Sequence, residues 1–433
     1  MRRELRRHPI EPPTTSVVLH EGELAFARPS DPVFSIVIPV FNHVAVTLEC
    51  MRSVASAAAS EAFEVILVDD ASTDADVDEL RQVPGAIYLR NPANHGFVAT
   101  CNAGAAVARG RILVFLNSDT LVTPDWLKRI GETLSQPGVG LVGTLLQYPD
   151  GTLQEAGGIV FSDGSGWNYG RGGNPADPRY RYRRDTDYCS GAALAISRER
   201  FRSLGGFDAH YAPGYYEDTD LAMKVRSAGD RVVYEPSVAI VHLEGVSAGK
   251  ELSTGMKAFQ VTNAIKFQQR WARELQHAHA PTGTDPDLAA RLSPVTRAVA
   301  VCGHAGAARL PGFYELLESL VQQHIAVDLH FLEAPEETWL CRLRSGGICC
   351  WTPDWRETAL WVLLKTGAEV GVVLGDGSAA SEAWIRKITP DVPNAVKLRH
   401  GIAEEGAMGF PVVTPGDVVE ALTGSRGRVQ GRQ

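Results

Sequence analysis

The sequence lacks the cysteine pattern of a disulfide framework or of a zinc site. Its seven cysteines are odd in number, and no two of them are spaced as Cys-x-x-Cys. Small secreted domains depend on paired cysteines, and structural zinc sites use closely spaced ones. The cysteine usage therefore favours a reducing compartment, and we expect a cytoplasmic protein.

Long hydrophobic runs are also missing. The basic residues 1–9 are not followed by the apolar stretch of a signal peptide. The most apolar late stretch, residues 359–374, is interrupted by Lys365 and Glu369 and predicts no transmembrane helix. A helix predicted over 253–276 carries several Lys and Arg residues; we expect it to pack on its own domain, with a peripheral position at the inner face of the membrane as the alternative.

Positive charge is scarce relative to negative charge. The chain has 42 Lys and Arg residues against 51 Asp and Glu residues, a net charge of -9 at pH 7. Because binding to nucleic acid depends on a basic excess that neutralises phosphates, we expect no nucleic acid partner. A small anionic ligand needs only a local pocket or a metal ion, so the net charge does not exclude a nucleotide.

The length of 433 residues exceeds what one hydrophobic core usually fills, and it predicts two domains. The composition changes along the chain suggest where they begin and end. We expect an N-terminal arm over 1–30, a first domain over 31–280, a linker over 281–295, a small α/β domain over 296–405 and a tail over 406–433.

Short apolar runs alternate with helical segments, which predicts an α/β fold. In the first domain, runs at 34–38, 63–68 and 111–116 indicate buried parallel strands, and 45–59 indicates a helix. The small domain shows the same alternation, with strands expected at 298–302, 326–331 and 370–374 and helices at 312–323 and 356–365. Ligands of such sheets bind beyond the carboxyl ends of the strands, so the residues after each run are the candidates for function.

Two carboxylates, Asp69 and Asp70, follow the second run. Side chains at this position can accept hydrogen bonds from ribose hydroxyls or a base N–H. The alternative is a cap for the next helix, which we expect for Asp74. Asp119 follows the third run within Asn117-Ser118-Asp119 and suits a divalent cation that bridges a diphosphate, although such a turn is common by itself.

A third acidic group, Glu217, Asp218 and Asp220, lies at a predicted helix start. Mutual repulsion predicts a raised pKa for at least one of them, while a helix N-terminus favours acids without any catalytic role. His242 follows a further apolar run, where a lone histidine is more often structural than a metal ligand. The glycine-rich residues 245–255 suit either a lid, with Lys250 over the diphosphate, or a surface loop.

Taken together and in this order, the motifs resemble those of glycosyltransferase family 2, in particular bacterial rhamnosyltransferase-like and cell-surface-glycan enzymes. The resemblance covers about residues 33–275 and rests on the ordered set IPVFN, VDDASTD, NHGFVATCNAG, FLNSD, GGFD with YYEDTDL, and VHLEGVS. It implies the GT-A nucleotide-diphospho-sugar transferase fold, a Rossmann-like mixed sheet flanked by helices. It also implies an inverting, metal-dependent transfer in cell-surface polysaccharide synthesis.

The resemblance implies a role for each matching residue. The nucleotide-sugar contacts are Pro39, Phe41, Asp69, Asp70, Asn102 and Asp119, the metal ligands are Asp119 and His242, the catalytic base is Asp218, and Glu217 orients the acceptor. The cofactor is Mn²⁺ or Mg²⁺, the donor a dTDP-, UDP- or GDP-sugar, and the acceptor a hydroxyl of a glycan, glycolipid or other molecule. One departure is Asn117, which stands where the family's metal motif begins with an acid, so the site loses one charge.

Two other classes of function are open to an α/β chain of this kind. A sugar nucleotidyltransferase or a dehydrogenase places a glycine-rich loop after the first strand, but residues 38–44 contain no glycine, lysine or arginine. A non-catalytic module that binds nucleotides or glycans is the second alternative. Asp119, Asp218 and His242 count against it, whereas Asn117 is compatible with it.

Overall fold

A computed structural model describes residues 24–57, 61–243, 258–290, 297–302, 313–322, 326–352, 370–375 and 396–399. The backbone contacts divide the chain into two compact units. One contains Met1–Pro175 and Arg184–Gly283, and the other contains Ala176–Arg183 and Thr284–Gln433. Most of the expected arm, the 245–255 segment, the helix expected at 356–365 and the tail lie outside the described residues, so these expectations stay predictions.

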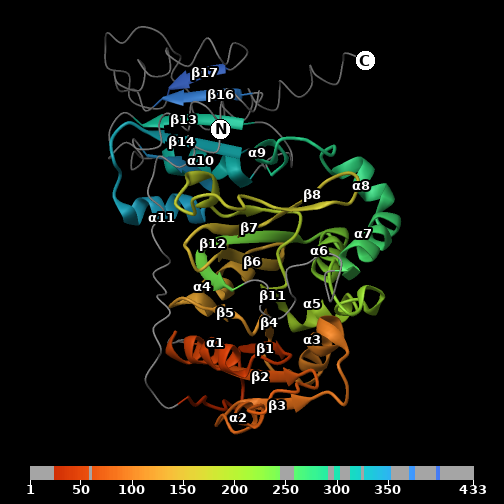
Figure 1. Cartoon of the computed structure of the whole chain (residues 1–433). Helices are drawn as coiled ribbons and strands as arrows, with labels where there is room; N and C mark the ends of the chain where they lie inside the picture. The colour runs from red at the N-terminus through yellow and green to blue at the C-terminus, as the bar shows by residue number, and fades with distance from the viewer. Residues whose placement is uncertain are drawn as a thin grey trace. The chain divides into compact units, whose positions relative to one another are not determined.

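The first unit contains a mixed sheet with ten described strands in its hydrogen-bonded network, in the main order β10-β12-β6-β11-β4-β1-β2-β3. These are β1 (Phe34–Val40), β2 (Phe63–Asp69), β3 (Ile87–Arg90), β4 (Ile112–Leu116), β5 (Thr120–Leu121), β6 (Val139–Gln147), β7 (Leu153–Ala156), β10 (Arg184–Asp185), β11 (Ala193–Ser197) and β12 (Arg231–His242). β1 is parallel to β2 and β4, whereas β11 is antiparallel to β4 and β6. The sheet is therefore mixed, as the sequence predicted (Figure 1).

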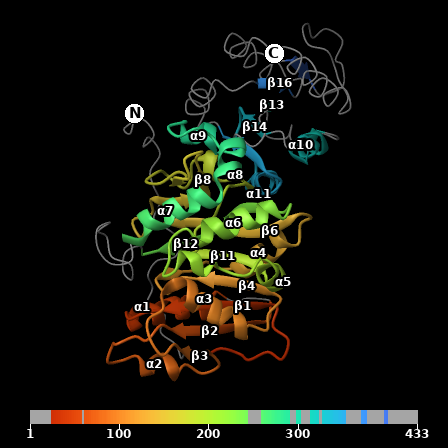
Figure 2. The ribbon, with the colours of Figure 1, turned by 90° about the vertical axis from the view of Figure 1, so that its right-hand side faces the viewer.

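Helices cover both faces of this sheet. They are α1 (Val44–Ser56), α2 (Asp78–Arg81), α3 (Gly96–Val107), α4 (Trp126–Leu134), α5 (Arg198–Ser203), α6 (Glu217–Ser227), α7 (Ala258–Arg270) and α8 (Ala272–Ala278). Because side chains alternate along a strand, Ile36 and Ile38 pack with α1 and α4, whereas Val37 packs with α3. Figure 2 looks onto the second face, with α3, α6 and α7 in front of the sheet.

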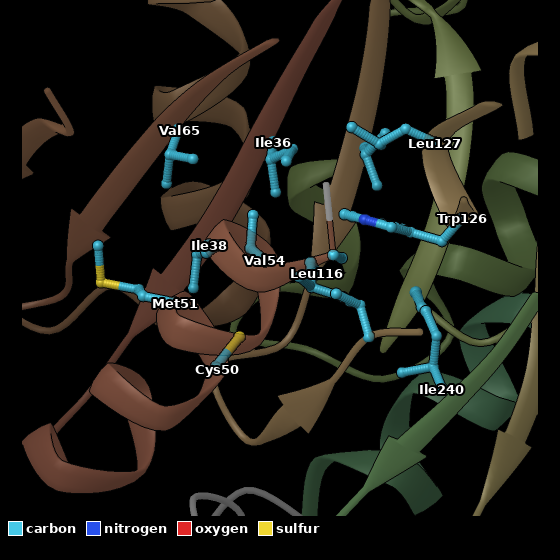
Figure 3. Packing of buried hydrophobic residues seen from close by; sticks show 14 of the residues in the cluster. Ile36, Ile38, Cys50, Met51, Val54, Val65, Leu116, Trp126, Leu127 and Ile240 are labelled. Carbon is cyan, nitrogen blue, oxygen red and sulfur yellow. The ribbon is translucent and has the colours of Figure 1, made fainter. Parts of the chain in front are cut away.

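The core on the first face is centred on a tryptophan. Trp126 at the start of α4 is only 1% exposed and lies beside Leu127, near Leu116 of β4 and Ile240 of β12 (Figure 3). On the other face, Gly104 lets α3 approach the sheet closely, because a Cβ there would lie 2.4 Å from Cγ1 of Val37. Both faces of the sheet are thus closely packed. A functional site is therefore expected at the polar ends of the strands.

Shorter elements complete the first unit. A hairpin of β8 (Gly158–Val160) and β9 (Gly166–Asn168) forms a separate two-stranded sheet, and the 3-10 helix η2 covers Ala209–Tyr211. The single helix predicted over 253–276 is wrong in one respect. The described part is two helices, α7 and α8, which meet at Trp271, where the backbone leaves the helical region.

The second unit contains a parallel sheet of five described strands in the order β15-β14-β13-β16-β17. Its elements are the 3-10 helix η1 (Pro178–Tyr180), α9 (Pro286–Ala289), β13 (Arg297–Cys302), α10 (Phe313–Gln322), β14 (Ala326–Phe331), α11 (Glu337–Ser345), β15 (Ile348–Trp351), β16 (Val370–Gly375) and β17 (Val396–Arg399). All four strand pairs are parallel. This matches the small α/β unit that the apolar runs predicted.

We predict that Trp126→Ala lowers the free energy of unfolding of the first unit by about 3–5 kcal/mol, because it leaves a large cavity in a closely packed core. Urea unfolding followed by circular dichroism measures the change. Trp167→Ala is the matched control, since Trp167 is 48% exposed and should change the unfolding free energy little. Equal losses in the two variants would contradict the central place of Trp126.

Candidate active site

The turns after β1 and β2 are joined by hydrogen bonds. Oδ1 of Asn42 accepts from the Thr73 amide at 2.7 Å, and Oγ of Ser72 accepts from the Asn42 amide at 2.8 Å. Asp74 was expected to cap the helix that follows it. Its carboxylate instead accepts, at 3.3 Å, from the amide of Val44, the first residue of α1. The expected capping role therefore holds for a different helix.

Asp69 is fully buried at the end of β2, and its carboxylate is saturated with donors. It accepts from the Ser72 amide at 2.8 Å and from the Tyr88 hydroxyl at 2.5 Å, and it forms an ion pair with Arg90. Burial alone would raise the pKa of Asp69, but the hydrogen bonds from Ser72 and Tyr88 and the charge of Arg90 outweigh it and lower that pKa. Asp69 thus holds the turn together as a carboxylate.

Asp70 reaches the N-terminus of α3. Its two oxygens accept from the Gly96 amide at 2.7 Å, the His95 amide at 2.9 Å and the Asn91 side chain at 2.7 Å. A carboxylate at this position stabilises the helix because it satisfies free N–H groups at the positive end of the helix dipole. Asp70 therefore fixes α3 against the end of β2.

The remaining residues predicted to contact the donor come from different elements. Pro39 lies inside β1, opposite Val68, because the strand expected from the run at 34–38 extends to Val40. Phe41, just after β1, is 37% exposed and free to meet a ligand. The amide of Asn102 makes two hydrogen bonds with the backbone of Phe207, at 2.8 and 3.1 Å. Donor contacts by these residues stay predictions.

Asp119 and His242, which the resemblance pairs as metal ligands, lie close together. Thr120 of β5 pairs with His242 of β12, and Nε2 of His242 lies 3.2 Å from Oδ1 of Asp119. Nδ2 of Asn117 lies 3.4 Å from the same ring nitrogen. Both Asp119 and His242 are buried. The carboxylate, the imidazole and the amide therefore form one cluster at the carboxyl end of β4.

The other ring nitrogen of His242 is held by a residue that the sequence did not single out. Nδ1 of His242 lies 3.0 Å from Oε1 of Gln154, which is buried in β7. If Nδ1–H donates to this carbonyl oxygen, the lone pair of Nε2 faces Asp119. Gln154 can take this position because the β6–β7 register shifts there: Leu146 pairs with Glu155 and Gln147 with Leu153.

This cluster fits a divalent cation. Neighbouring ligands of one octahedral Mg²⁺ lie about 3 Å apart, close to the 3.2 Å between Asp119 and His242. Among the described residues, no three His, Cys, Asp or Glu side chains converge as a metal site. The protein therefore offers one carboxylate and one imidazole, with the Asn117 amide beside them, and a diphosphate is the natural source of further oxygen ligands.

Asp218 lies in the first turn of α6, half-buried, with its carboxylate held by backbone donors. Oδ2 accepts from the Gly191 amide at 2.9 Å, and Oδ1 accepts from the Thr219 amide at 2.6 Å. Burial raises the pKa of Asp218, although these hydrogen bonds act in the opposite direction. A carboxylate with a raised pKa that stays oriented by two N–H groups is suited to accept a proton.

The two acids beside Asp218 have different surroundings. Glu217 is buried, and its Oε2 has no hydrogen-bond partner among the described residues. Burial, and then the charge of Asp218, raise the pKa of Glu217 well above its usual value. Asp220 is fully buried and accepts from the Trp271 indole at 2.9 Å, with Lys224 at 3.0 Å. Asp220 is thus structural, and the predicted pKa rise falls on Glu217 and Asp218.

Three consecutive residues before β11 connect the acidic helix to the Asp119 cluster. The Gly191 amide donates to Asp218, and the carbonyl oxygen of Ala192 accepts from the Asn117 amide at 2.9 Å. A Cβ on Gly191 would lie 3.3 Å from the Phe97 ring and 3.6 Å from Cβ of Asp218. Since Phe97 follows the α3 N-terminus that Asp70 binds, residues far apart in the sequence meet at one edge of the sheet.

The sequence reading missed Gln154, Glu155 and Gly191. The importance of Glu155 and Gln154 comes from their contacts with Ser190 and His242, which are distant in the sequence. The only indication in the sequence is that Gln154 and Glu155 stand between the apolar residues Leu153 and Ala156. Gly191 could not be identified from the sequence, because it acts through its backbone N–H, which every residue except proline has.

Comparison with known proteins identifies the first unit. Residues 35–204 match the family model described as "Glycosyl transferase family 2". This match confirms the resemblance predicted from the motifs, and together with the mixed sheet it confirms the predicted GT-A fold. No described helix is both long and apolar enough to cross a membrane.

Three curated relatives show how far the likeness extends. "Uncharacterized protein y4gI" of Sinorhizobium fredii is 30% identical over 66% of this chain and 33% of its own length. "O-antigen biosynthesis protein RfbC" of Myxococcus xanthus is 29% identical over 50% of this chain and 18% of its own length. "N-acetylglucosaminyl-diphospho-decaprenol L-rhamnosyltransferase" of Mycobacterium tuberculosis is 27% identical over 52% of this chain and 80% of its own length. The chain thus spans a third or less of the first two relatives.

We predict that Asp69→Asn destabilises the fold at pH 7 by about 2 kcal/mol, the usual cost of losing hydrogen bonds to a charged group. The pKa of Asp69 is lower in the folded state, so this stabilisation is present above the unfolded pKa of about 3.9 and is lost as pH falls through the folded pKa. Urea unfolding at several pH values between 7 and 3 measures the difference in unfolding free energy between the wild type and Asp69→Asn. The exposed Asp76→Asn is the control, and a difference that persists unchanged at pH 3 would contradict the prediction.

Proposed function

Since residues 35–204 match the model of glycosyl transferase family 2, we propose that this chain is an inverting glycosyltransferase, which moves a sugar from a nucleotide-diphosphate donor to an acceptor hydroxyl. One observation carries the proposal. The segment Ser190–Ala192 is hydrogen bonded to Asp218 on one side and to Asn117, beside Asp119, on the other. A proton acceptor and a cluster suited to a metal-bound diphosphate therefore belong to one site.

In the proposed reaction Asp218 is the general base. Inversion requires the acceptor hydroxyl to attack the anomeric carbon from the face opposite the leaving diphosphate. The hydroxyl proton passes to Asp218 as the new glycosidic bond forms and the bond to the diphosphate breaks. The Gly191 and Thr219 amides orient the carboxylate, and its raised pKa makes it a stronger base than an ordinary aspartate.

Asp119 and His242 are the proposed ligands of Mn²⁺ or Mg²⁺, and the Asn117 amide lies beside them. When bound, such an ion stabilises negative charge on a departing diphosphate. The residues of the chain do the orienting: Gln154 holds the His242 ring, and the pairing of β5 with β12 brings Asp119 to it. The proposed role of Glu217 is to orient the acceptor next to Asp218.

The names of the relatives suggest a class of donor and of acceptor. These relatives include an O-antigen biosynthesis protein and an N-acetylglucosaminyl-diphospho-decaprenol L-rhamnosyltransferase. We therefore propose a dTDP-, UDP- or GDP-sugar donor and a glycan or glycolipid acceptor in cell-surface polysaccharide synthesis. The chain is proposed to act on the cytoplasmic side, with α7, which exposes Phe259, Val261 and Ile265, as its peripheral contact with the membrane.

We predict that Asp218→Asn lowers kcat by ~10²–10⁴-fold, because the amide cannot accept the hydroxyl proton. The dissociation constant of the donor, measured by calorimetry with Mn²⁺ present, should change little. In the wild type, kcat/KM should rise with pH through an apparent pKa above the usual value of about 3.9 for aspartate.

The control for this variant is Asp125→Asn, which changes an exposed aspartate at the start of α4 and should leave kcat unchanged. Turnover in Asp218→Asn equal to that of the wild type would remove Asp218 from the role of base. A loss of donor binding of the same size would point to a structural effect instead.

We predict that EDTA abolishes transfer and that Mn²⁺ or Mg²⁺ restores it. His242→Ala should weaken Mn²⁺ binding at least about tenfold in titrations followed by electron paramagnetic resonance with the donor nucleotide present. His210→Ala is the control, because His210 lies in η2 and is not part of the Asp119–His242 pair. Full activity after thorough chelation would refute the metal site.

A further inference from the structure

Glu155 is a buried carboxyl group for which the proposed reaction has no role. It lies in β7, it is 1% exposed, and its Oε2 has no hydrogen-bond partner among the described residues. A buried carboxylate with an unpaired oxygen is unfavourable, so an apolar residue would be expected in its place unless the group makes an essential contact. That contact is at its other oxygen.

Oε1 of Glu155 accepts a hydrogen bond from the Ser190 amide at 2.9 Å. The next amide along the chain, that of Gly191, donates to Oδ2 of Asp218, also at 2.9 Å. The two N–H groups belong to successive planar peptides joined at the Cα of Ser190, so once the first peptide is anchored only the φ and ψ of Ser190 set the direction of the Gly191 N–H. The two hydrogen bonds therefore form a relay from Glu155 to Asp218 through one short backbone segment.

We propose that Glu155 is a positioning residue for Asp218: it holds Ser190 so that the Gly191 N–H stays directed at the Asp218 carboxylate. This inference rests on the proposed function of Asp218 as general base. An apolar side chain at position 155 would leave the Ser190 N–H unpaired and free the segment to turn away. The same strand then supports both halves of the site, since Gln154 holds His242.

The charge state of Glu155 agrees with this role. Burial, and to a smaller extent the charge of Asp218, raise the pKa of Glu155 to about 8. At pH 7 the group is therefore mostly neutral, and it presents a carbonyl-like oxygen to Ser190. A glutamine presents the same oxygen at the same place, so it is a faithful substitute.

Several ionisable groups face this pair and belong in any interpretation of its pH dependence. They interact electrostatically with Glu155 or Asp218: Arg171, Arg184, Tyr188, Cys189, Tyr216 and Glu217. The variants that test the proposal leave all six unchanged. A shift between wild type and variant therefore reports on the relay itself.

The test compares two substitutions of similar size, Glu155→Gln and Glu155→Met. Glutamine keeps the acceptor for Ser190 and methionine removes it. We expect E155Q to retain kcat within about threefold and E155M to lose up to about a hundredfold, since small displacements of a catalytic group have effects of this size. The donor KM should stay unchanged in both variants.

The pH profile separates positioning from a general structural effect. The Gly191 hydrogen bond lowers the pKa of Asp218, so its loss should raise that pKa and move the acidic limb of kcat/KM to higher pH. We expect this shift in E155M and not in E155Q. Glu235→Met is the control: Glu235 is equally buried, but it accepts from Thr133 and Ser237, and its loss should lower stability without moving the limb.

Two results would overturn the proposal: E155M with the kcat and pH profile of the wild type, or E155Q impaired as much as E155M. If E155M does not fold, Glu155→Asp, which withdraws the acceptor by one methylene group, replaces it with the same expectations. If the wild type shows no transfer, the proposed function fails. The relay is then judged by carbon-13 NMR titration of Asp218, whose pKa should be higher in E155M than in E155Q.

Discussion

The backbone of Ser190–Ala192, just before β11, is the constraint on which the site depends. Its amides and carbonyl bind Glu155, Asp218 and Asn117, which come from β7, α6 and the end of β4. β11 itself is antiparallel to β4 on one side and to β6 on the other, so the position of this segment is set by the middle of the sheet. A rigid sheet thereby determines the separation of the groups that the proposed reaction needs.

Identical side chains have opposite properties at this edge because their surroundings differ. Asp69 and Asp70 are saturated with donors, and they tie turns and a helix together. Glu217 and Glu155 are buried and Asp218 is half-buried, and burial raises the pKa of each. The first pair therefore stabilises the fold, whereas the second group holds protons more tightly than ordinary carboxyl groups do.

The two proposed metal ligands show how a weak sequence signal becomes a specific geometry. Asp119 and His242 are separated by more than a hundred residues, and β5 and β12 bring them to 3.2 Å. Asn117, which replaces an acid, remains beside the pair at 3.4 Å. The three side chains of Asn117, Asp119 and His242 thus stay together although position 117 carries no charge. Gln154, which is not one of the three, orients the His242 imidazole.

The sequence by itself determined the α/β class and the strands near whose ends Asp69, Asp70 and Asp119 lie, and it indicated the resemblance to a family, because apolar periodicity and ordered motifs are local properties. It also indicated that Asp218 lies among repelling acids. The tertiary structure decided which acids are saturated and which are not, since donors such as Arg90 or the Gly191 amide come from distant parts of the chain. Burial and long-range hydrogen bonds set the pKa of each of these carboxyl groups, and both arise only when the chain folds.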